Sequence, residues 1–345
     1  MHQILCIIQD SGPERIFLPG RFLFQLLNQK SFLFTSNMRY NGNGMKMLAS
    51  EPARGREDYK LSRFILSAFA DEIDTDLKTQ MDVLEQHDIH YIEMRGVYGK
   101  GVVEYPLDRV KEFKKQLDDR GFKISAVGSP IGKIKITDPF APHLDLFKHT
   151  LEIAKILETK YIRMFSFYIP RGEDPVKYRD EVMERWNRFV EAAKGTGLTL
   201  LHENEKDIYG DIPERCLDLI QTMNCDYVKA VFDPANFVQC DVKTYPEAFE
   251  LLKDHVVYMH IKDALYSDHR VVPSGHGDGK VKEILSALYH SGFEGFLSIE
   301  PHLGNFVGLA ALELDSAIAN MPNGGPKQFA IAAQALKKII QELEG

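Results

Sequence analysis

Residues 198–205 read LTLLHENE, four apolar or β-branched residues that pass directly into His202, Glu203, Asn204 and Glu205. The run follows a Gly-X-Gly stop at the end of a helical pattern, so it predicts a buried parallel strand. Buried strands do not normally end in a carboxylate, because desolvating an unpaired charge costs several kcal/mol. We therefore expect a positively charged group to meet Glu203.

Three later strand-like segments share this feature. VKAVFD ends on Asp233, VVYMHIKD carries His260, and FLSIE ends on Glu300. Since side chains alternate along a strand, the residue two positions before each of them, apolar except for Ser298, shares its face. If the apolar residues point into a barrel, Glu203, Asp233, His260 and Glu300 converge at its carboxyl-terminal end. Three carboxylates and one imidazole suit one divalent ion, with Mn²⁺, Zn²⁺, Co²⁺ and Mg²⁺ all allowed.

Strand-like and helix-like segments alternate between residues 64 and 344. The predicted strands are 64–69, 89–94, 122–127, 160–165, 198–203, 227–232, 256–261 and 296–300. The predicted helices are 74–88, 106–121, 143–158, 174–194, 211–223, 244–254, 279–292 and 328–344, the first capped by Asp74 or Thr75. Eight such units predict an α/β fold, a (β/α)₈ TIM barrel, over residues 63–345. A doubly wound sheet would need a glycine-rich turn after the first strand, and SAFADEID offers none.

The composition limits the classes of function. A hydrophobic content of 44% and a charged content of 27% are typical of a soluble globular protein. No segment approaches the ~18 apolar residues that span a bilayer, so no membrane partner is expected. The net charge of −8 argues against a nucleic-acid partner. The four cysteines lack CxxC spacing, which indicates reduced thiols and predicts a cytoplasmic protein.

Residues 1–62 differ from the rest of the chain. FLFQLLNQKSFLF is apolar but interrupted by polar residues, and no small-residue cleavage site follows it, so a secretory signal is poorly supported. The polar, glycine-containing segment before residue 64 has the composition of a linker. We expect an N-terminal extension that is flexible or reflects a mis-assigned start, with the natural start near Met45 or Met47.

Each polar residue at a strand end has a simpler interpretation when it is taken alone. A strand-end glutamate commonly pairs with a lysine or arginine, and Lys262 and Arg163 are candidates. A single histidine such as His260 is more often a hydrogen-bonded core residue than a ligand. Four such residues on consecutive strands, each at the correct end, favour a metal site.

The motifs HENE, FDPAN, MHIKD and GFLSIEPH, in this order, resemble those of the xylose isomerase-like barrels. This sugar isomerase and epimerase superfamily also contains inosose dehydratase and the AP endonuclease branch, and the resemblance covers about residues 64–305. It implies metal ligands at Glu203, Asp233, His260 and Glu300, with Glu203 and Glu300 also acting as the acid–base pair. The implied reaction is isomerisation or epimerisation of a sugar or sugar phosphate through a metal-stabilised enediolate. Dehydration of an inosose or a sugar acid at the same metal site is the alternative.

Other polar residues near the strand ends are expected to contact the substrate. These are Glu93, Arg163, Asn236, Lys262 and His302. A structural ion pair is the alternative for Glu93 and Arg163. The loops after the first four strands should set the substrate. The glycine-rich loop PSGHGDG, residues 273–279, is expected either to bind a phosphate or to form a tight turn.

Two rival functions follow from the same motifs. The AP endonuclease branch has Asp-x-x-His where this chain has Asp233-Pro-Ala-Asn236, and the second and third strands end without a ligand histidine. Together with the acidic net charge, this argues against repair of abasic DNA. A barrel that binds a sugar without converting it remains open, and so does a homo-oligomer.

Overall fold

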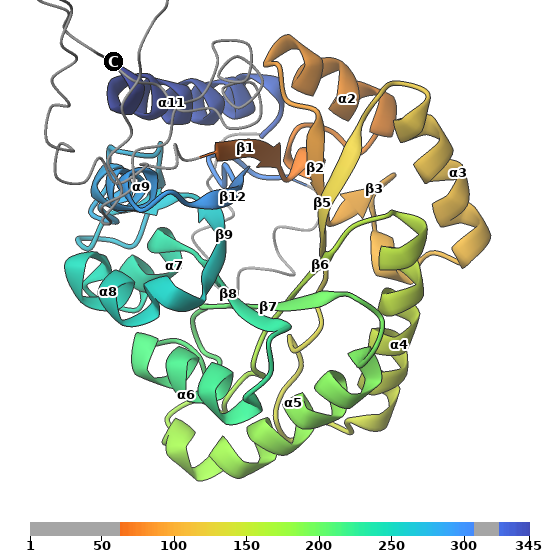
Figure 1. Cartoon of the computed structure of the whole chain (residues 1–345), viewed down its shortest axis with the longest axis vertical. Helices are drawn as coiled ribbons and strands as arrows, with labels where there is room; N and C mark the ends of the chain where they lie inside the picture. Colours follow the sequence, from red (N-terminus) through yellow and green to blue (C-terminus); the bar gives the residue numbers. More distant parts are fainter. Residues whose placement is uncertain (1–62, 307–323) are drawn as a thin grey trace, which may run out of the picture. The chain divides into compact units, whose positions relative to one another are not determined.

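Eight parallel strands close into a barrel in the order β1-β12-β9-β8-β7-β6-β5-β2 (Figure 1). The computed structural model describes residues 63–306 and 324–345, so the predicted extension at residues 1–62 lies outside the described residues. The strands are β1 (Arg63–Ala68), β2 (Tyr91–Met94), β5 (Lys123–Gly128), β6 (Tyr161–Met164), β7 (Thr199–Glu203), β8 (Val228–Phe232), β9 (Val256–Ile261) and β12 (Glu294–Ile299). The predicted (β/α)₈ barrel is confirmed.

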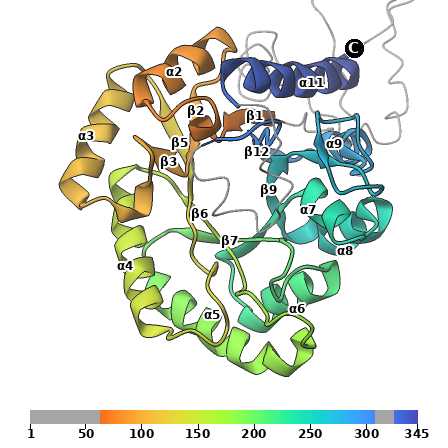
Figure 2. The ribbon, with the colours of Figure 1, turned by 180° about the vertical axis from the view of Figure 1, so that it is seen from behind.

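Helices surround the barrel, as Figures 1 and 2 show from its two ends. The longer ones are α2 (Leu77–Gln86), α3 (Leu107–Asp118), α4 (Ala141–Ile156), α5 (Arg179–Ala193), α6 (Pro213–Met223), α9 (Val281–His290) and α11 (Pro326–Glu344). The shorter ones are η1 (Ala70–Glu72), η2 (Val102–Glu104), η3 (Pro175–Tyr178), α7 (Pro234–Gln239), η4 (Thr244–Ala248), α8 (Phe249–Leu252) and η5 (Lys253–His255). Among the described residues, no helix has the length and apolar character needed to cross a membrane.

Local hydrogen bonding and proline explain where the elements differ from the predictions. Asp76 caps α2, because its side chain accepts a hydrogen bond from Thr79 N, whereas Asp74 accepts one from Asp76 N before the helix begins. The predicted helix 244–254 is divided into η4, α8 and η5. Tyr245 is extended there, with φ −139° and ψ 134°, as expected for a residue that precedes a proline.

Short elements that were not predicted lie in the loops at the carboxyl ends of the strands. Helix α7 follows β8 directly. The hairpin β3 (Gly96–Val97)–β4 (Lys100–Gly101) follows β2, and the hairpin β10 (Asp263–Ala264)–β11 (Val271–Val272) follows β9. These elements are too short to give a periodic pattern in the sequence, yet they lie where the functional residues of such barrels are found.

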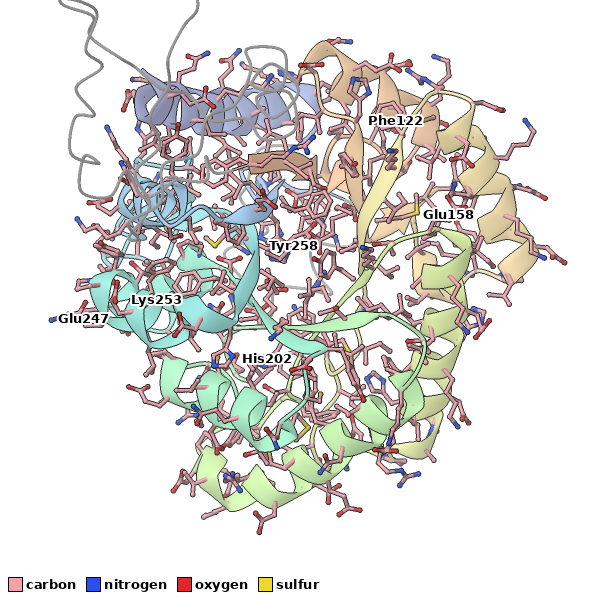
Figure 3. All side chains as sticks on the ribbon, viewed as in Figure 1. Phe122, Glu158, His202, Glu247, Lys253 and Tyr258 are labelled. Atoms are coloured by element: carbon pink, nitrogen blue, oxygen red, sulfur yellow. The ribbon has the colours of Figure 1, made fainter. Side chains whose placement is uncertain are left out.

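The apolar side chains on the inner strand faces form a small core of their own. Leu201, Val231 and Tyr258 pack together with Ala126, separately from the larger core (Figure 3 labels Tyr258). Each of the three lies two positions before Glu203, Asp233 or His260, so the alternation of side chains places the polar residues directly beyond this core. His202 faces the opposite way, and its ring lies 5.7 Å from that of Trp186 in α5.

His143 in α4 fastens the loop that follows β5. Its Nε2 accepts a hydrogen bond of 2.7 Å from Gly132 N. A Cβ on Gly132 would lie 2.1 Å from Phe165 O, so this loop passes close to the end of β6. Burial, with a contribution from Arg185, lowers the pKa of His143 to about 4. The imidazole of His143 is therefore neutral when it accepts the hydrogen bond from Gly132 N.

We predict that His143 makes the protein less stable in acid. In the unfolded chain His143 binds a proton below its ordinary pKa of 6.5, but in the folded chain only below about 4. The free energy of unfolding should therefore fall as the pH is lowered from 6.5 to 4, by at most about 1.4 kcal/mol per pH unit from this group. Urea unfolding across this range should give a flatter pH dependence for His143→Gln. The control His290→Gln, at an exposed position, should follow the wild type. Equal slopes for His143→Gln and the wild type would contradict the prediction.

Candidate metal centre

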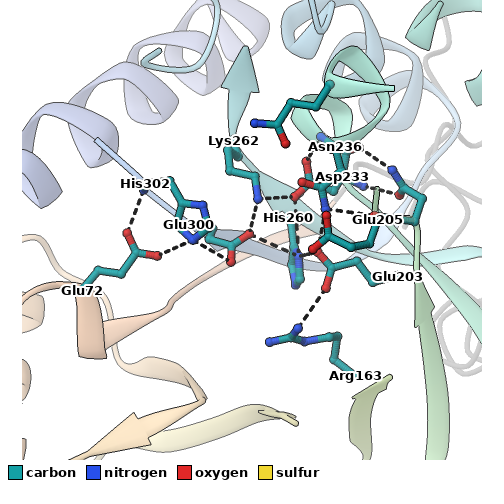
Figure 4. Close-up of polar contacts among 12 residues, drawn as sticks. Glu72, Arg163, Glu203, Glu205, Asp233, Asn236, His260, Lys262, Glu300 and His302 are labelled. Atoms are coloured by element: carbon teal, nitrogen blue, oxygen red, sulfur yellow. Dashed lines mark hydrogen bonds and ion pairs between the residues drawn. The ribbon is translucent and has the colours of Figure 1, made fainter. Parts of the chain in front are cut away.

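Four neighbouring strands bring the predicted ligands together at one end of the barrel (Figure 4). Glu203 is the last residue of β7, Asp233 follows β8, His260 lies in β9, and Glu300 follows β12. One ligand atom from each side chain lies within 4.8 Å of those of the other three. None of the four residues is more than 4% exposed. They form a compact, buried group of three carboxylates and one imidazole.

The two nitrogens of His260 face different carboxylates. Nδ1 lies 2.9 Å from Glu203 Oε1, 3.7 Å from Glu300 Oε2 and 3.9 Å from Asp233 Oδ2. Nε2 lies 3.2 Å from Glu93 Oε2 on the other side of the ring. Nδ1 is therefore the nitrogen available to a metal, while Glu93 fixes the orientation of the ring, as carboxylates behind histidine ligands do.

The chemistry of the buried oxygens fits a divalent ion. Glu203 Oε2 and Asp233 Oδ2 accept no hydrogen bond from any residue within 63–306 or 324–345. Most buried polar atoms do have such a partner, so these two oxygens require another source of compensation. A carboxylate-rich set with one imidazole suits Mn²⁺, Zn²⁺, Co²⁺ or Mg²⁺ and does not distinguish among them.

Two cations also approach these oxygens. Lys262 Nζ lies 3.0 Å from Asp233 Oδ2 and 2.9 Å from Glu300 Oε2. Arg163 Nη1 lies 3.2 Å from Glu203 Oε2. The ion pairs considered as the simpler interpretation are therefore present beside the candidate metal site. They place two positive charges beside three carboxylates.

The buried charges shift the pKa values of the cluster in different directions. Burial raises the pKa of Asp233 to about 6, because Lys262 offsets only part of its effect. Burial would also raise the pKa of Glu300, but Lys262 and His302 hold it well below its ordinary range. Burial would lower the pKa of His260, but Glu203 and Glu93 raise it well above its ordinary value. Glu300 is therefore ionised at neutral pH.

A second group of polar residues supports Glu300 from the side of β1 and β2. Arg95 donates to Glu300 Oε1 at 3.1 Å, to Glu72 Oε1 at 3.1 Å and to Asp71 Oδ2 at 2.8 Å. His302 Nε2 lies 3.3 Å from Glu300 Oε1, and His302 N donates to Glu72 Oε2 at 2.7 Å. Atoms of Glu72, Glu300 and His302 also lie within 4.8 Å of one another, but Arg95 already supplies positive charge there.

Two asparagines link the motifs HENE and FDPAN. The Asn204 side chain donates to Asp233 O at 2.8 Å and accepts from Asp233 N at 2.9 Å. Asn236 Nδ2 donates to Asn204 O at 2.9 Å and to Glu203 Oε1 at 3.2 Å. Asp233 caps α7 by accepting a hydrogen bond from Asn236 N. These bonds fix Glu203 and Asp233 relative to each other.

A pocket with about 850 Å³ of empty space, part of it open to solvent, is lined mainly by the loops after β1, β2 and β5, together with Arg163 in β6. These three loops are among the four expected to set the substrate. Of the five predicted substrate contacts, only Arg163 lines the pocket. Glu93, Lys262, Asn236 and His302 instead contact the candidate ligands.

Several residues of this site were not predicted from the sequence. Asp71, Glu72 and Lys133 are the main ones, and Lys133 Nζ pairs with Glu205 Oε2 at 2.8 Å. Asp71 and Glu72 follow the first strand directly, and this position is the signal that would have identified them. Lys133 lies in a loop without a comparable pattern.

Comparisons with known proteins agree with this architecture. The family model described as "Xylose isomerase-like TIM barrel" matches residues 81–337. Similar solved structures include an L-ribulose 3-epimerase, 17% identical, with a TM-score of 0.65 over 82% of this chain and 95% of that one. Another is the IOLI protein with a zinc atom, 16% identical, with a TM-score of 0.62 over 81% and 99% of the two chains. A third is the probable 3-DHS dehydratase AsbF from Bacillus anthracis, 12% identical, with a TM-score of 0.60 over 80% and 99%. At these identities the likeness shows the fold. No curated protein matches the chain significantly.

The glycine-rich loop at residues 273–279 binds a carboxylate of the protein itself. Gly275 N and Gly277 N donate to Asp263 Oδ2 at 2.9 and 3.0 Å, and Gly279 N donates to Asp263 Oδ1 at 2.8 Å. A Cβ on Gly277 would lie 2.3 Å from Asp263 Oδ1. The amides that were expected either to hold a phosphate or to form a turn are thus used by Asp263, and the loop is a tight turn beside β9.

We predict that Gly277→Ala destabilises the protein by about 1–3 kcal/mol, the usual cost of inserting a methyl group where there is no room for it. The added Cβ has to displace the Asp263 carboxylate, which accepts hydrogen bonds from the three glycine amides of this loop. Chemical denaturation measures the change in free energy. His276→Ala, at an exposed position in the same loop, is the control and should have little effect. A Gly277→Ala variant as stable as the wild type would show that the loop does not depend on this close approach.

Proposed function

This chain belongs to the xylose isomerase-like TIM barrel family, and from that premise we propose that it is a divalent-metal-dependent isomerase or epimerase acting on a sugar or sugar phosphate. The observation that carries the proposal is the buried group formed by Glu203, Asp233, His260 and Glu300. The epimerase among the similar folds supports the same class of reaction.

The metal would be held by one oxygen each from Glu203, Asp233 and Glu300, together with His260 Nδ1. When bound, it would supply a Lewis acid that stabilises the charge developing when a proton leaves the carbon beside a carbonyl. Glu93 keeps Nδ1 directed at the carboxylates by occupying the Nε2 side of the ring.

Glu203 and Glu300 are the proposed proton carriers. Both face His260 Nδ1, at 2.9 Å for Glu203 Oε1 and 3.7 Å for Glu300 Oε2 (Figure 4). Lys262 and His302 keep Glu300 ionised, and it can therefore accept a proton. Asn236 and Arg163 orient Glu203. A proton taken from one face of the substrate carbon and returned from the other gives an epimer, and return to the neighbouring carbon gives an isomer.

The remaining predicted substrate contacts divide into two groups. Glu93, Asn236, Lys262 and His302 are proposed to position His260, Glu203 and Glu300, since each contacts one of these residues. Arg163 also faces the pocket and is proposed to contact the substrate itself.

Dehydration is the second candidate reaction. Removing the same proton can lead to loss of a hydroxyl group from the next carbon, so the same residues serve both outcomes. The dehydratase named among the similar folds favours keeping this alternative.

We predict that the wild-type protein binds one Mn²⁺ ion and that Asp233→Asn weakens this binding by at least about 10–100-fold, the loss typical of removing even a residue behind a ligand. The amide keeps the shape of the side chain but loses its negative charge. Calorimetric titration of the metal-stripped protein measures the affinity. Glu173→Gln, which removes an exposed carboxylate paired with Lys177, should bind as the wild type does. Equal affinity in Asp233→Asn would remove Asp233 from the ligand set.

We predict that Glu203→Gln and Glu300→Gln each lower the exchange of substrate hydrogen with D₂O by about 10²–10⁴-fold, because an amide cannot carry the proton. A panel of ketopentoses and ketohexoses, with and without a terminal phosphate, would be followed by NMR in the Mn²⁺-loaded protein. Glu173→Gln is again the control.

The products of this assay separate the alternatives. An unsaturated or dicarbonyl product would identify a dehydratase. Sugar binding without exchange in the wild type would indicate a non-catalytic barrel. Exchange that survives in both glutamine variants would exclude these residues as the acid–base pair.

A further inference from the structure

Arg163 is a buried cation whose hydrogen-bonding capacity is largely unused. Its side chain is 4% exposed and lines the pocket beside the metal centre. Nη1 lies 3.2 Å from Glu203 Oε2, and Nε lies 3.9 Å from Glu93 Oε1, too far for a hydrogen bond. Nε has no hydrogen-bond partner among the described residues. A guanidinium has five N–H donors, so burying it with two such contacts leaves a cost that a ligand would remove.

The pocket leaves space at the other end of this guanidinium. Gly128, the last residue of β5, lines the pocket beside Arg163. A Cβ at this position would lie 3.3 Å from Arg163 Nη2 and 3.2 Å from Arg95 Cβ. The absence of a side chain at Gly128 therefore keeps Nη2 open to a molecule in the pocket.

Lys133 is a second buried cation in the lining of the pocket. Its Nζ lies 4.4 Å from the centre of the Phe165 ring, and the guanidinium carbon of Arg163 lies 4.6 Å from the same centre. The Lys133 Nζ atom and the guanidinium carbon of Arg163 are therefore at most 9.0 Å apart. The Lys133 side chain is 7% exposed and lines the pocket.

Arg163 is the least compensated of the buried cations that line the pocket. Arg95 is paired with Asp71, Glu72 and Glu300, and Lys133 is paired with Glu205. The positive charge of Arg163 is balanced mainly by Glu203, which is also a proposed metal ligand. A divalent ion would take up part of the charge of Glu203 and leave Arg163 less compensated.

We propose that the substrate carries an oxyanion, either a carboxylate or a phosphate, and that Arg163 binds it with support from Lys133. This inference rests on the proposed function of the adjacent metal centre and narrows its substrate class. A planar guanidinium matches two oxygens of a carboxylate or phosphate at once. A neutral hydroxyl group offers a weaker bond and leaves the buried charge unbalanced. The anionic group lies close to the reacting carbons, because Arg163 contacts Glu203, the proposed proton carrier.

The test compares three probes with a shared three-carbon frame, namely glycerol, D-glycerate and glycerol 3-phosphate. Each is titrated into the full-length Mg²⁺-loaded protein, and its affinity is measured by calorimetry. At least one of the two anions should bind the wild type about ten-fold or more tightly than glycerol, as expected for hydrogen bonds between charged groups. Whether glycerate or glycerol 3-phosphate is preferred identifies the oxyanion as carboxylate or phosphate.

Two variants test whether the preference for anions over glycerol arises at Arg163. Arg163→Gln should abolish it, and Gly128→Ala, which keeps every charge, should reduce it by narrowing the space at Nη2. The matched control is Arg185→Gln. Arg185 is another buried arginine, stacked on Phe140 and Phe167 and away from the metal centre, so its loss should leave the preference intact.

Equal binding of glycerol and both anions, no binding of either anion, or a preference that persists in Arg163→Gln would overturn the inference. These titrations do not depend on turnover. An anion preference that depends on Arg163, in a protein without hydrogen exchange, would support the oxyanion site and refute the proposed catalysis. Hydrogen exchange on neutral sugars, in a protein that shows no preference for anions, would support the proposed catalysis and refute the oxyanion site.

Discussion

The site depends on an electrostatic constraint: carboxylates buried at the ends of β7, β8 and β12 have to face positive charge. Glu203 lies against His260 and Arg163, and Glu300 lies against Lys262 and Arg95. Leaving any of these carboxylates unpaired would cost several kcal/mol, so each cation is part of the structure as well as of the site. A divalent ion would extend the same compensation to the buried oxygens that accept no hydrogen bond.

Barrel geometry meets this constraint through side-chain alternation. The residues that fill the barrel interior, Leu201, Val231 and Tyr258, share a strand face with Glu203, Asp233 and His260, respectively, two positions later. The apolar core and the charged site are thus two levels of the same inner surface. The asparagine links between Asn204, Asp233 and Asn236 then fix positions that the strands alone would leave adjustable.

This arrangement explains which features of the fold and of the site could be predicted from the sequence. Alternation and strand ends predict which side chains share a face, and this was enough for the barrel and for the grouping of the four candidate ligands. They do not predict which side chains from other strands contact these residues. Arg95 reaches Glu300 because β2 and β12 both neighbour β1, a contact between residues 205 positions apart. The direction of Glu93, toward His260 rather than the pocket, and the use of three glycine amides by Asp263 also depend on the folded chain.

The two halves of the chain contribute different parts of the site. All four candidate ligands come from the ends of β7, β8, β9 and β12, whereas the pocket is lined, apart from Phe306, by residues of β5, β6 and the loops after β1, β2 and β5. Glu203 and Arg163 lie where these halves meet, since β6 and β7 are paired, and their contact joins the proton carrier to the wall of the pocket. Because the two sets of residues lie on different strands, changes in the first four loops can alter the substrate without moving the ligands. The Arg163–Glu203 and Arg95–Glu300 pairs are exceptions, because a substitution at either arginine alters both the pocket and a carboxylate that is proposed to carry the proton.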